Sequence, residues 1–383
     1  MTRRIRPRPR PKPHPHPLQL YSLRDICTIR ILRFASSPEL LEQYTNASGG
    51  LRTGMLMEHL DSLAGSIAYK YMLGPEVETL GRVQERGFYI VTASVERLDM
   101  LAPLYPVRDI RLSGQVICTG KSSMEVAVKM EALNPNRREE TLMLGRFSMV
   151  CRNASTHKAH PVNLLIINTR EEKVLFKMGE SARNRRKYAA LHSLSRVPPS
   201  STEAAELHST YLKYGQDDES LALGDRVWMG DTLLEKTMLM FPQERNIHQK
   251  VFGVYTYQLG FANSCLFTRS HVSFLSLDGI AFRQPVPIGS ILRLRSQIIH
   301  TSPPGQLPAA VHVRVQASVV DVQTGQEEPT NDFRFTWTRD DGQTVPRIVV
   351  PRTYQEAMLW LEGQRALKMG TQIRGSRLQG RDR

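Results

Sequence analysis

Residues Thr53 to Met72 read TGMLMEHLDSLAGSIAYKYM, and this stretch decides the fold. Apolar residues recur in it at spacings of three and four, which is typical of one face of a helix about five turns long. Thr53 is a suitable N-cap, so we expect a helix roughly 30 Å long. Its apolar face consists of Leu56, Leu60, Leu63, Ala64, Ile67, Ala68 and Tyr71.

A second stripe makes the predicted helix apolar around most of its circumference, so we expect it to be largely buried. The stripe consists of Met57, Asp61, Ala64, Gly65, Ala68 and Met72. Burying a carboxylate is unfavourable without a partner, so Asp61 either pairs with a base such as Lys70 or takes part in chemistry. His59 is expected to be a packing or surface residue. Charged residues over this stretch exclude a membrane span.

The formal net charge of +14 belongs to the two ends of the 383-residue chain. Residues 1–34 hold nine Lys or Arg against one acid, and residues 365–383 hold six against one. The rest of the chain, with 36 basic and 35 acidic residues, is nearly neutral. A nucleic-acid partner is therefore not expected, because its basic footprint would lie on a face of the folded domain.

The four cysteines are far apart in the sequence and form no metal-ligand spacing, which fits a reduced intracellular compartment. The sequence has no apolar run long enough for a transmembrane segment and no secretory signal. It also lacks a Gly-rich phosphate loop and a G-x-S-x-G motif. We therefore expect neither a metal nor a cofactor.

We divide the chain into five segments. Residues 1–34 form a disordered arm in which prolines alternate with basic residues, either a targeting segment or an extension without that role. Residues 35–155 form a first domain, in which the long helix precedes strand-like runs at 88–100, 109–119, 124–133 and 142–152. Residues 156–224 form a helical linker, 225–352 a second domain, and 353–383 a C-terminal helix and basic tail.

The second domain repeats the first. The run SGQVICT at Ser113 to Thr119 corresponds to RSQIIHT at Arg295 to Thr301. Further strands are expected at 228–240, 270–282, 291–301, 309–322 and 332–338, with a helix near 251–267. One long helix followed by an antiparallel meander suggests a sheet curled around that helix. The chain is thus predicted to be a tandem duplication of α+β domains about 180 residues apart.

The two halves carry complementary residues. The loop FPQERNIHQKVFG, from Phe241 to Gly253, places Asn246 and His248 just before a predicted helix, whose free N–H groups can bind an oxyanion. The first half has no such loop, and the second has no acid that matches Asp61. If the halves pair about a pseudo-twofold axis, Asp61 and this loop would form one composite site.

The sequence resembles the mitochondrial type of acyl-CoA thioesterase with two hotdog domains in one chain, the acyl-coenzyme A thioesterase 9-like family. The resemblance is carried by LMEHLDSLAGSIAYK (Leu56 to Lys70), PQERNIH (Pro242 to His248) and PVPIGS (Pro285 to Ser290). It implies tandem hotdog domains, each a long central helix wrapped by a curved antiparallel sheet. It also implies hydrolysis of acyl-CoA, a mitochondrial matrix location and a homo-oligomer.

The resemblance assigns the site residues by role. Asp61 activates a water molecule, Asn246 orients that water or the carbonyl, and His248 assists or shapes the loop. Backbone N–H groups near Gly253 hold the thioester oxyanion. The cations expected to bind the CoA phosphates are Arg245, Lys250, Arg293 and Arg295.

Two alternatives stay open at this point. A hotdog hydratase or dehydratase shares the helix and sheet but acts on a β-hydroxyacyl group. A catalytically inactive acyl-CoA binding protein is suggested by a shortened second helix. The family usually has Gly-Gly there, then about fourteen residues before an Ala-Asn pair, whereas Gly253 is followed by Val254 and Asn263 comes ten residues later.

Overall fold

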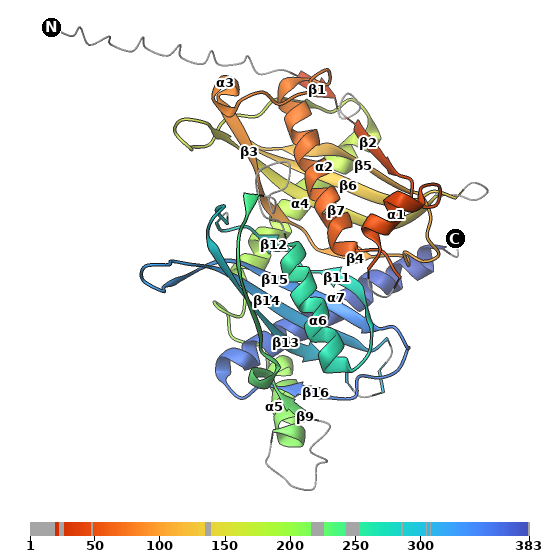
Figure 1. The fold of residues 1–383 in the computed structure, drawn as a ribbon, viewed down its shortest axis with the longest axis vertical. Helices are drawn as coiled ribbons and strands as arrows, with labels where there is room; N and C mark the ends of the chain where they lie inside the picture. The colour runs from red at the N-terminus through yellow and green to blue at the C-terminus, as the bar shows by residue number, and fades with distance from the viewer. Residues whose placement is uncertain are drawn as a thin grey trace, which may run out of the picture.

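The computed structural model describes residues 20–22, 27–46, 49–134, 139–215, 226–242, 253–284, 286–303, 305–306 and 308–381. Over these ranges the chain forms two sheet-and-helix halves stacked along the long axis of the molecule (Figure 1). In both halves a long helix lies across an antiparallel sheet. The fold is therefore of the α+β class that the sequence predicted.

The first half is built around α2, which runs from Thr53 to Leu73 and buries most of its length. Its strands pair in the order β4-β7-β6-β5-β2, with β3 also against β7. The elements are β2 (Cys27–Leu32), α1 (Pro38–Tyr44), α3 (Val83–Arg86), β3 (Phe88–Val95), β4 (Leu98–Met100), β5 (Ile110–Thr119), β6 (Ser123–Ala132) and β7 (Glu140–Asn153).

The second half repeats the order of the strands and the long helix along the chain. Its strands pair in the order β11-β15-β14-β13-β10. Its elements are β10 (Leu234–Leu239), α6 (Val254–Thr268), β11 (Val272–Leu277), β12 (Ile280–Ala281), β13 (Ile291–Thr301), β14 (Ala310–Val320) and β15 (Glu327–Arg339). Each strand after α2 thus has a counterpart after α6, from β3 and β11 to β7 and β15, whereas α3 has none among the described residues.

The two halves join edge to edge into one 12-stranded sheet. The junction is reciprocal, because β4 of the first half pairs with β11, while β12 of the second half pairs with β3. α2 and α6 both lie on the front face of this sheet (Figure 1). They meet near the start of α2, where a Cβ on Gly54 would lie 3.2 Å from the ring of Tyr257.

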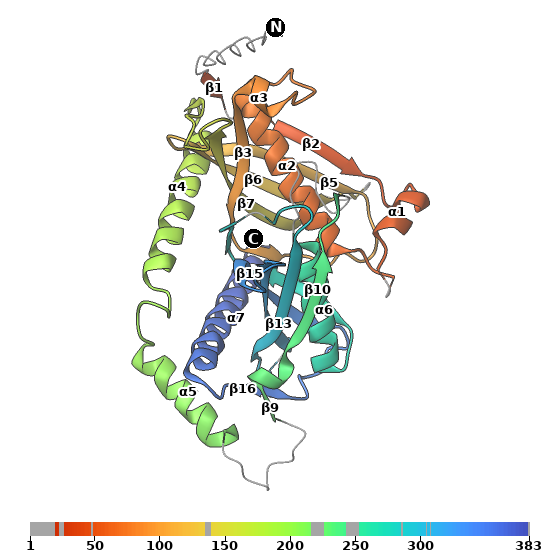
Figure 2. The same ribbon diagram turned by 60° about the vertical axis from the view of Figure 1, so that its left-hand side comes forward.

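The other face of the sheet is covered by helices from outside the repeat (Figure 2). α4 (Arg170–Leu191) packs so closely on β5 that a Cβ on Gly179 would lie 2.5 Å from the Cβ of Cys118. α7 (Tyr354–Arg381) covers β13 and β14, and α5 (Ser201–Tyr214) leads from α4 toward it. The short elements are β1 (Leu20–Ser22), paired with β8 (Leu164–Ile166), η1 (Met229–Thr232), and β9 (Arg226–Trp228), paired with β16 (Ile348–Val350).

Several boundaries differ from the sequence predictions. The arm was expected to reach residue 34, but Cys27–Leu32 form β2 and pair with β5, because the alternation of Ile29 and Ile31 with polar residues suits an edge strand. The run expected at 88–100 is two strands, interrupted at 96–97. α7 continues to Arg381, through the residues that were expected to form a basic tail after the C-terminal helix. No helix among the described residues is long and apolar enough to cross a membrane.

Candidate active site

Asp61 lies in the middle of α2, only 5% exposed, on the side of the helix that faces β3. The Thr92 hydroxyl donates a hydrogen bond to Asp61 Oδ1 at 2.9 Å. Met57 and Ala64, one turn away on either side, are 3% and 0% exposed. The carboxylate is therefore held in a largely apolar layer between helix and sheet, with a hydroxyl donor beside it.

A β-bulge positions Thr92. The pairing of β3 with β7 shifts register between Thr92 and Ser94. A bulge adds one residue to a strand and re-aims the side chains on either side of it. Here the irregularity lies at the strand position whose hydroxyl reaches the buried acid.

The start of α6 lies at the same junction between the two halves. A Cβ on Gly253 would lie 2.9 Å from the ring of Phe333, whose centroid is 6.3 Å from that of Phe282. The backbone N–H of Phe282 donates to the carbonyl of Ala93 at 2.9 Å, next to Thr92. A continuous chain of contacts therefore links the N-terminus of α6 to the bulge that holds Thr92 against Asp61.

The predicted loop residues lie outside the described residues of the chain. Asn246, His248, Arg245 and Lys250 all fall between residues 243 and 252. Their roles remain predictions. Gly253 is described, and it is the N-cap residue of α6. The first N–H groups of a helix have no partner within the helix, so the role of those near Gly253 in binding an oxyanion stays a prediction.

Arg293 and Arg295 lie on the back face of the sheet, away from α6. Ser296, which faces α6, accepts a hydrogen bond from Asn263, so its odd-numbered neighbours on β13 point the other way. Arg293 and Arg295 each pair with Glu235 on β10 and Glu327 on β15. The structure does not bring these two arginines to Asp61, because strand alternation assigns them to the opposite face.

Another polar pair ties α1 to the site helix. Tyr44 Oη and His59 Nε2 are in hydrogen-bond contact, and their ring centroids are 5.5 Å apart. Burial, aided by Arg30, lowers the pKa of His59 to about 4. His59 is therefore neutral at physiological pH and has a packing role, as the sequence predicted.

Sequence reasoning missed Thr92. A threonine in a strand is ordinary, and the bulge that aims it has no reliable sequence signature. Among the described residues, no group of three or more His, Cys, Asp or Glu could hold a metal ion.

Comparison with known proteins places the chain in a family. It is 34% identical over 348 residues to the acyl-coenzyme A thioesterase 9, mitochondrial, of Bos taurus, covering 88% of this chain and 76% of that protein. The human protein of the same name is also 34% identical, over 346 residues, covering 88% of this chain and 75% of its own. The chain belongs to the acyl-coenzyme A thioesterase 9 family.

As a member of the acyl-coenzyme A thioesterase 9 family, the chain can be compared with more distant proteins. A plant relative, acyl-coenzyme A thioesterase 2, chloroplastic, of Humulus lupulus, is 31% identical, covering 88% of this chain and 78% of that protein. Among solved structures, an acyl-ACP thioesterase from Bacteroides thetaiotaomicron is 10% identical, with a TM-score of 0.47, covering 83% of this chain and 100% of that chain. No family model matches the sequence.

Proposed function

We propose that the chain hydrolyses the thioester of fatty acyl-CoA to free fatty acid and CoA. The observation that carries this proposal is the buried Asp61 carboxylate, held by Thr92 at the junction where the N-terminus of α6 also arrives. The names of the relatives at 34% identity support the substrate class. Each half, with its long helix on an antiparallel sheet and the same order of strands, fits a hotdog domain in a tandem arrangement.

The reaction uses water as the nucleophile. Asp61 accepts a proton from water, and the water oxygen bonds to the thioester carbonyl carbon, a role worth about 10² to 10⁴ in rate. Backbone N–H groups at Gly253 stabilise the negative charge that develops on the carbonyl oxygen. The carbon–sulfur bond then breaks, and the proton held by Asp61 passes to the CoA sulfur, which restores the carboxylate. Asn246 orients the water or the carbonyl, and His248 assists or shapes the loop.

Thr92 positions the base. By donating to Oδ1 it fixes the orientation of the carboxylate that receives the proton from water. A misplacement of a reacting group by about 1 Å can cost roughly 10²-fold in rate, so the orientation that Thr92 gives to Asp61 matters to that extent.

Thiol release from a panel of acyl-CoAs tests the proposal. We expect Asp61→Asn to lose about 10²- to 10⁴-fold in kcat, and Thr92→Val up to about 10²-fold. Thr92→Ser, which keeps the hydroxyl, should retain most activity, and Asp231→Asn, on the exposed η1 turn, should change nothing. Full activity in Asp61→Asn would sink the mechanism.

Assays with acyl-CoAs also distinguish thioester hydrolysis from the two alternative functions. Hydration of crotonyl-CoA without thiol release would favour a hydratase. Acyl-CoA binding with turnover no better than that of Asp61→Asn would favour a binding protein.

Location and assembly belong to the proposal as well. The mammalian relatives are named as mitochondrial proteins, and the Arg-rich beginning of this sequence, free of acids before Asp25, suits a matrix location. We also propose that the chain forms a homo-oligomer. Import into isolated mitochondria tests the location, and sedimentation of the purified chain tests the assembly.

A further inference from the structure

A cavity of about 450 Å³ lies between the start of α2 and the side of α6. Apolar side chains form much of its lining, among them Leu51, Met55 and Phe261, and Arg52 is at the same pocket. Tyr257 of α6 also lines the cavity, where its ring packs on Gly54 and its hydroxyl is in a hydrogen bond with Thr53. The volume falls within the range of small-molecule sites. Neither Asp61 nor Thr92 is among the residues that line this pocket.

Helix packing shows which residue of α6 corresponds to Asp61. In the first half Ile67 lies over Gly114, where a Cβ would come within 2.8 Å of Ile67 Cδ1. In the second half Asn263 donates to Ser296 at 2.9 Å. The sequence repeat aligns Gly114 with Ser296, so Ile67 and Asn263 are equivalent. Six residues earlier stand Asp61 and Tyr257.

The register shifts of β3 and β11 independently support the equivalence of Asp61 and Tyr257. β3 carries its bulge between Thr92 and Ser94, and β11 carries one between Phe274 and Ser276. Thr92 and Phe274 are therefore equivalent. In the first half Thr92 bonds to Asp61, whereas in the second the rings of Phe274 and Tyr257 have centroids 5.9 Å apart. Two aromatic rings stand where the other half has a carboxylate and its donor.

We propose that this pocket is a second acyl-binding site that does not hydrolyse its ligand. It takes the acyl chain of a fatty acid or an acyl-CoA along its apolar wall, with the anionic end of the ligand toward Arg52. The inference rests on the proposed function, since it assigns to this pocket the ligand class of its counterpart at Asp61.

The residues that line the cavity account for the binding of an anionic acyl ligand and for the lack of its hydrolysis. The described residues around the cavity include no carboxylate that could activate water. Burial raises the pKa of Tyr257, so its hydroxyl stays protonated and is no base at neutral pH. None of the ion pairs among the described residues involves Arg52, whose side chain also makes no helix-cap hydrogen bond. Its charge is thus available to an anionic ligand.

The test counts binding sites on the full-length chain by titration calorimetry. The probes are dodecanoate and the dodecyl thioether analogue of an acyl-CoA, which no thioesterase can cleave. We expect wild type to bind two equivalents of the thioether. Met55→Trp, which fills the pocket, should bind one, while Met369→Trp, at an exposed position on α7, should bind two. Arg52→Gln should weaken the second site at least tenfold, and Arg196→Gln should not.

Thiol release measured on the same preparations separates the two proposals. Hydrolysis with one equivalent bound in both wild type and Met55→Trp would overturn the second site and leave the proposed function standing. If wild type binds two equivalents and Met55→Trp binds one, but no thiol is released, the second site stands and the proposed hydrolysis is overturned. If Met55→Trp does not fold, unchanged affinity in Arg52→Gln would itself overturn the second site. If Met55→Trp loses one equivalent of dodecanoate as well as one of the thioether, the acyl chain and one anion suffice for binding in the pocket. If the pocket binds the thioether but not dodecanoate, the CoA portion is required.

Discussion

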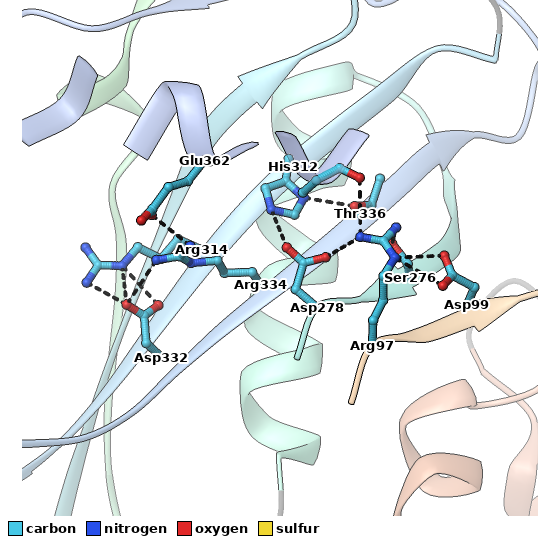
Figure 3. A network of polar contacts seen from close by, with 11 residues as sticks. Arg97, Asp99, Ser276, Asp278, His312, Arg314, Asp332, Arg334, Thr336 and Glu362 are labelled. Carbon is cyan, nitrogen blue, oxygen red and sulfur yellow. Dashed lines mark hydrogen bonds and ion pairs between the residues drawn. The ribbon is translucent and has the colours of Figure 1, made fainter. Parts of the chain in front are cut away.

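Replacing Arg97 by Met should loosen the junction between the two halves of the sheet. Arg97 lies between β3 and β4, and its side chain is 9% exposed. It bonds to Asp99 on β4 at 3.0 Å and to Asp278, beyond β11, at 2.5 Å. It also donates to Ser276 at 2.7 Å and to the carbonyl of Ala366 on α7 at 3.3 Å (Figure 3). One guanidinium thus joins both halves and the covering helix.

The magnitude follows from burial. Burial raises the pKa of Asp99 although Arg97 opposes the shift, whereas Asp278 is also held by His312 at 3.3 Å. Without Arg97 the Asp99 carboxylate, 8% exposed, loses its strongest donor. Breaking a buried ion pair by removing one partner costs about 3–5 kcal/mol. Arg97→Lys keeps the charge but not the fork of donors, so we expect a smaller loss of about 1–2 kcal/mol.

Urea unfolding at pH 7 measures these losses. Trp228 and Trp337 belong to the second half, and Trp360 lies on α7, which covers its sheet. Tryptophan fluorescence therefore follows the second half with α7, while circular dichroism follows the whole chain. The control is Arg185→Met, since Arg185 is 58% exposed and pairs with Glu96 at the surface. That variant should lose less than about 1 kcal/mol. A loss in Arg97→Met no greater than in Arg185→Met would refute the reasoning.

Two further changes test packing and burial. Gly114→Ala should lower the free energy of unfolding by about 1–3 kcal/mol, because its Cβ would lie 2.7 Å from the Ala127 carbonyl oxygen. Gly230→Ala is the control, since its Cβ would have no atom nearer than 3.4 Å. Equal losses of the two variants in urea unfolding would contradict the packing argument. His300 is 5% exposed beneath α7, and burial lowers its pKa to about 3. Between pH 6.5 and pH 3 the unfolded chain therefore binds a proton that the folded chain does not, so stability falls as pH falls. From pH 6.5 to pH 5 this group should account for about 2 kcal/mol, a loss that His300→Gln should not show in unfolding curves at the two pH values.

Much of the fold could be predicted because it depends on local patterns. The apolar periodicity of residues 53–72 predicted a helix, and the structure has this helix at Thr53–Leu73. Its two adjoining apolar stripes also predicted its burial, because apolar side chains on most of its circumference have to be kept from water. Ile291–Thr301 matched a predicted strand, because alternation and β-branched residues mark such a segment directly. Asp61 was singled out for the same reason, as the one acid in an apolar stripe.

Contacts between distant segments could not be predicted. Nothing near Thr92 in the sequence indicates that a bulge aims its hydroxyl at Asp61, and nothing near Arg293 indicates that the sheet turns this side chain away from α6. The equivalence of Tyr257 and Asp61 also required the packing of Asn263 on Ser296 and of Ile67 on Gly114. The sequence by itself determined the elements, their repetition and the buried acid, because periodicity and composition are local. Only the tertiary structure decided which side chains meet, because pairing across the sheet depends on register and on the reciprocal junction of β4 with β11 and of β3 with β12.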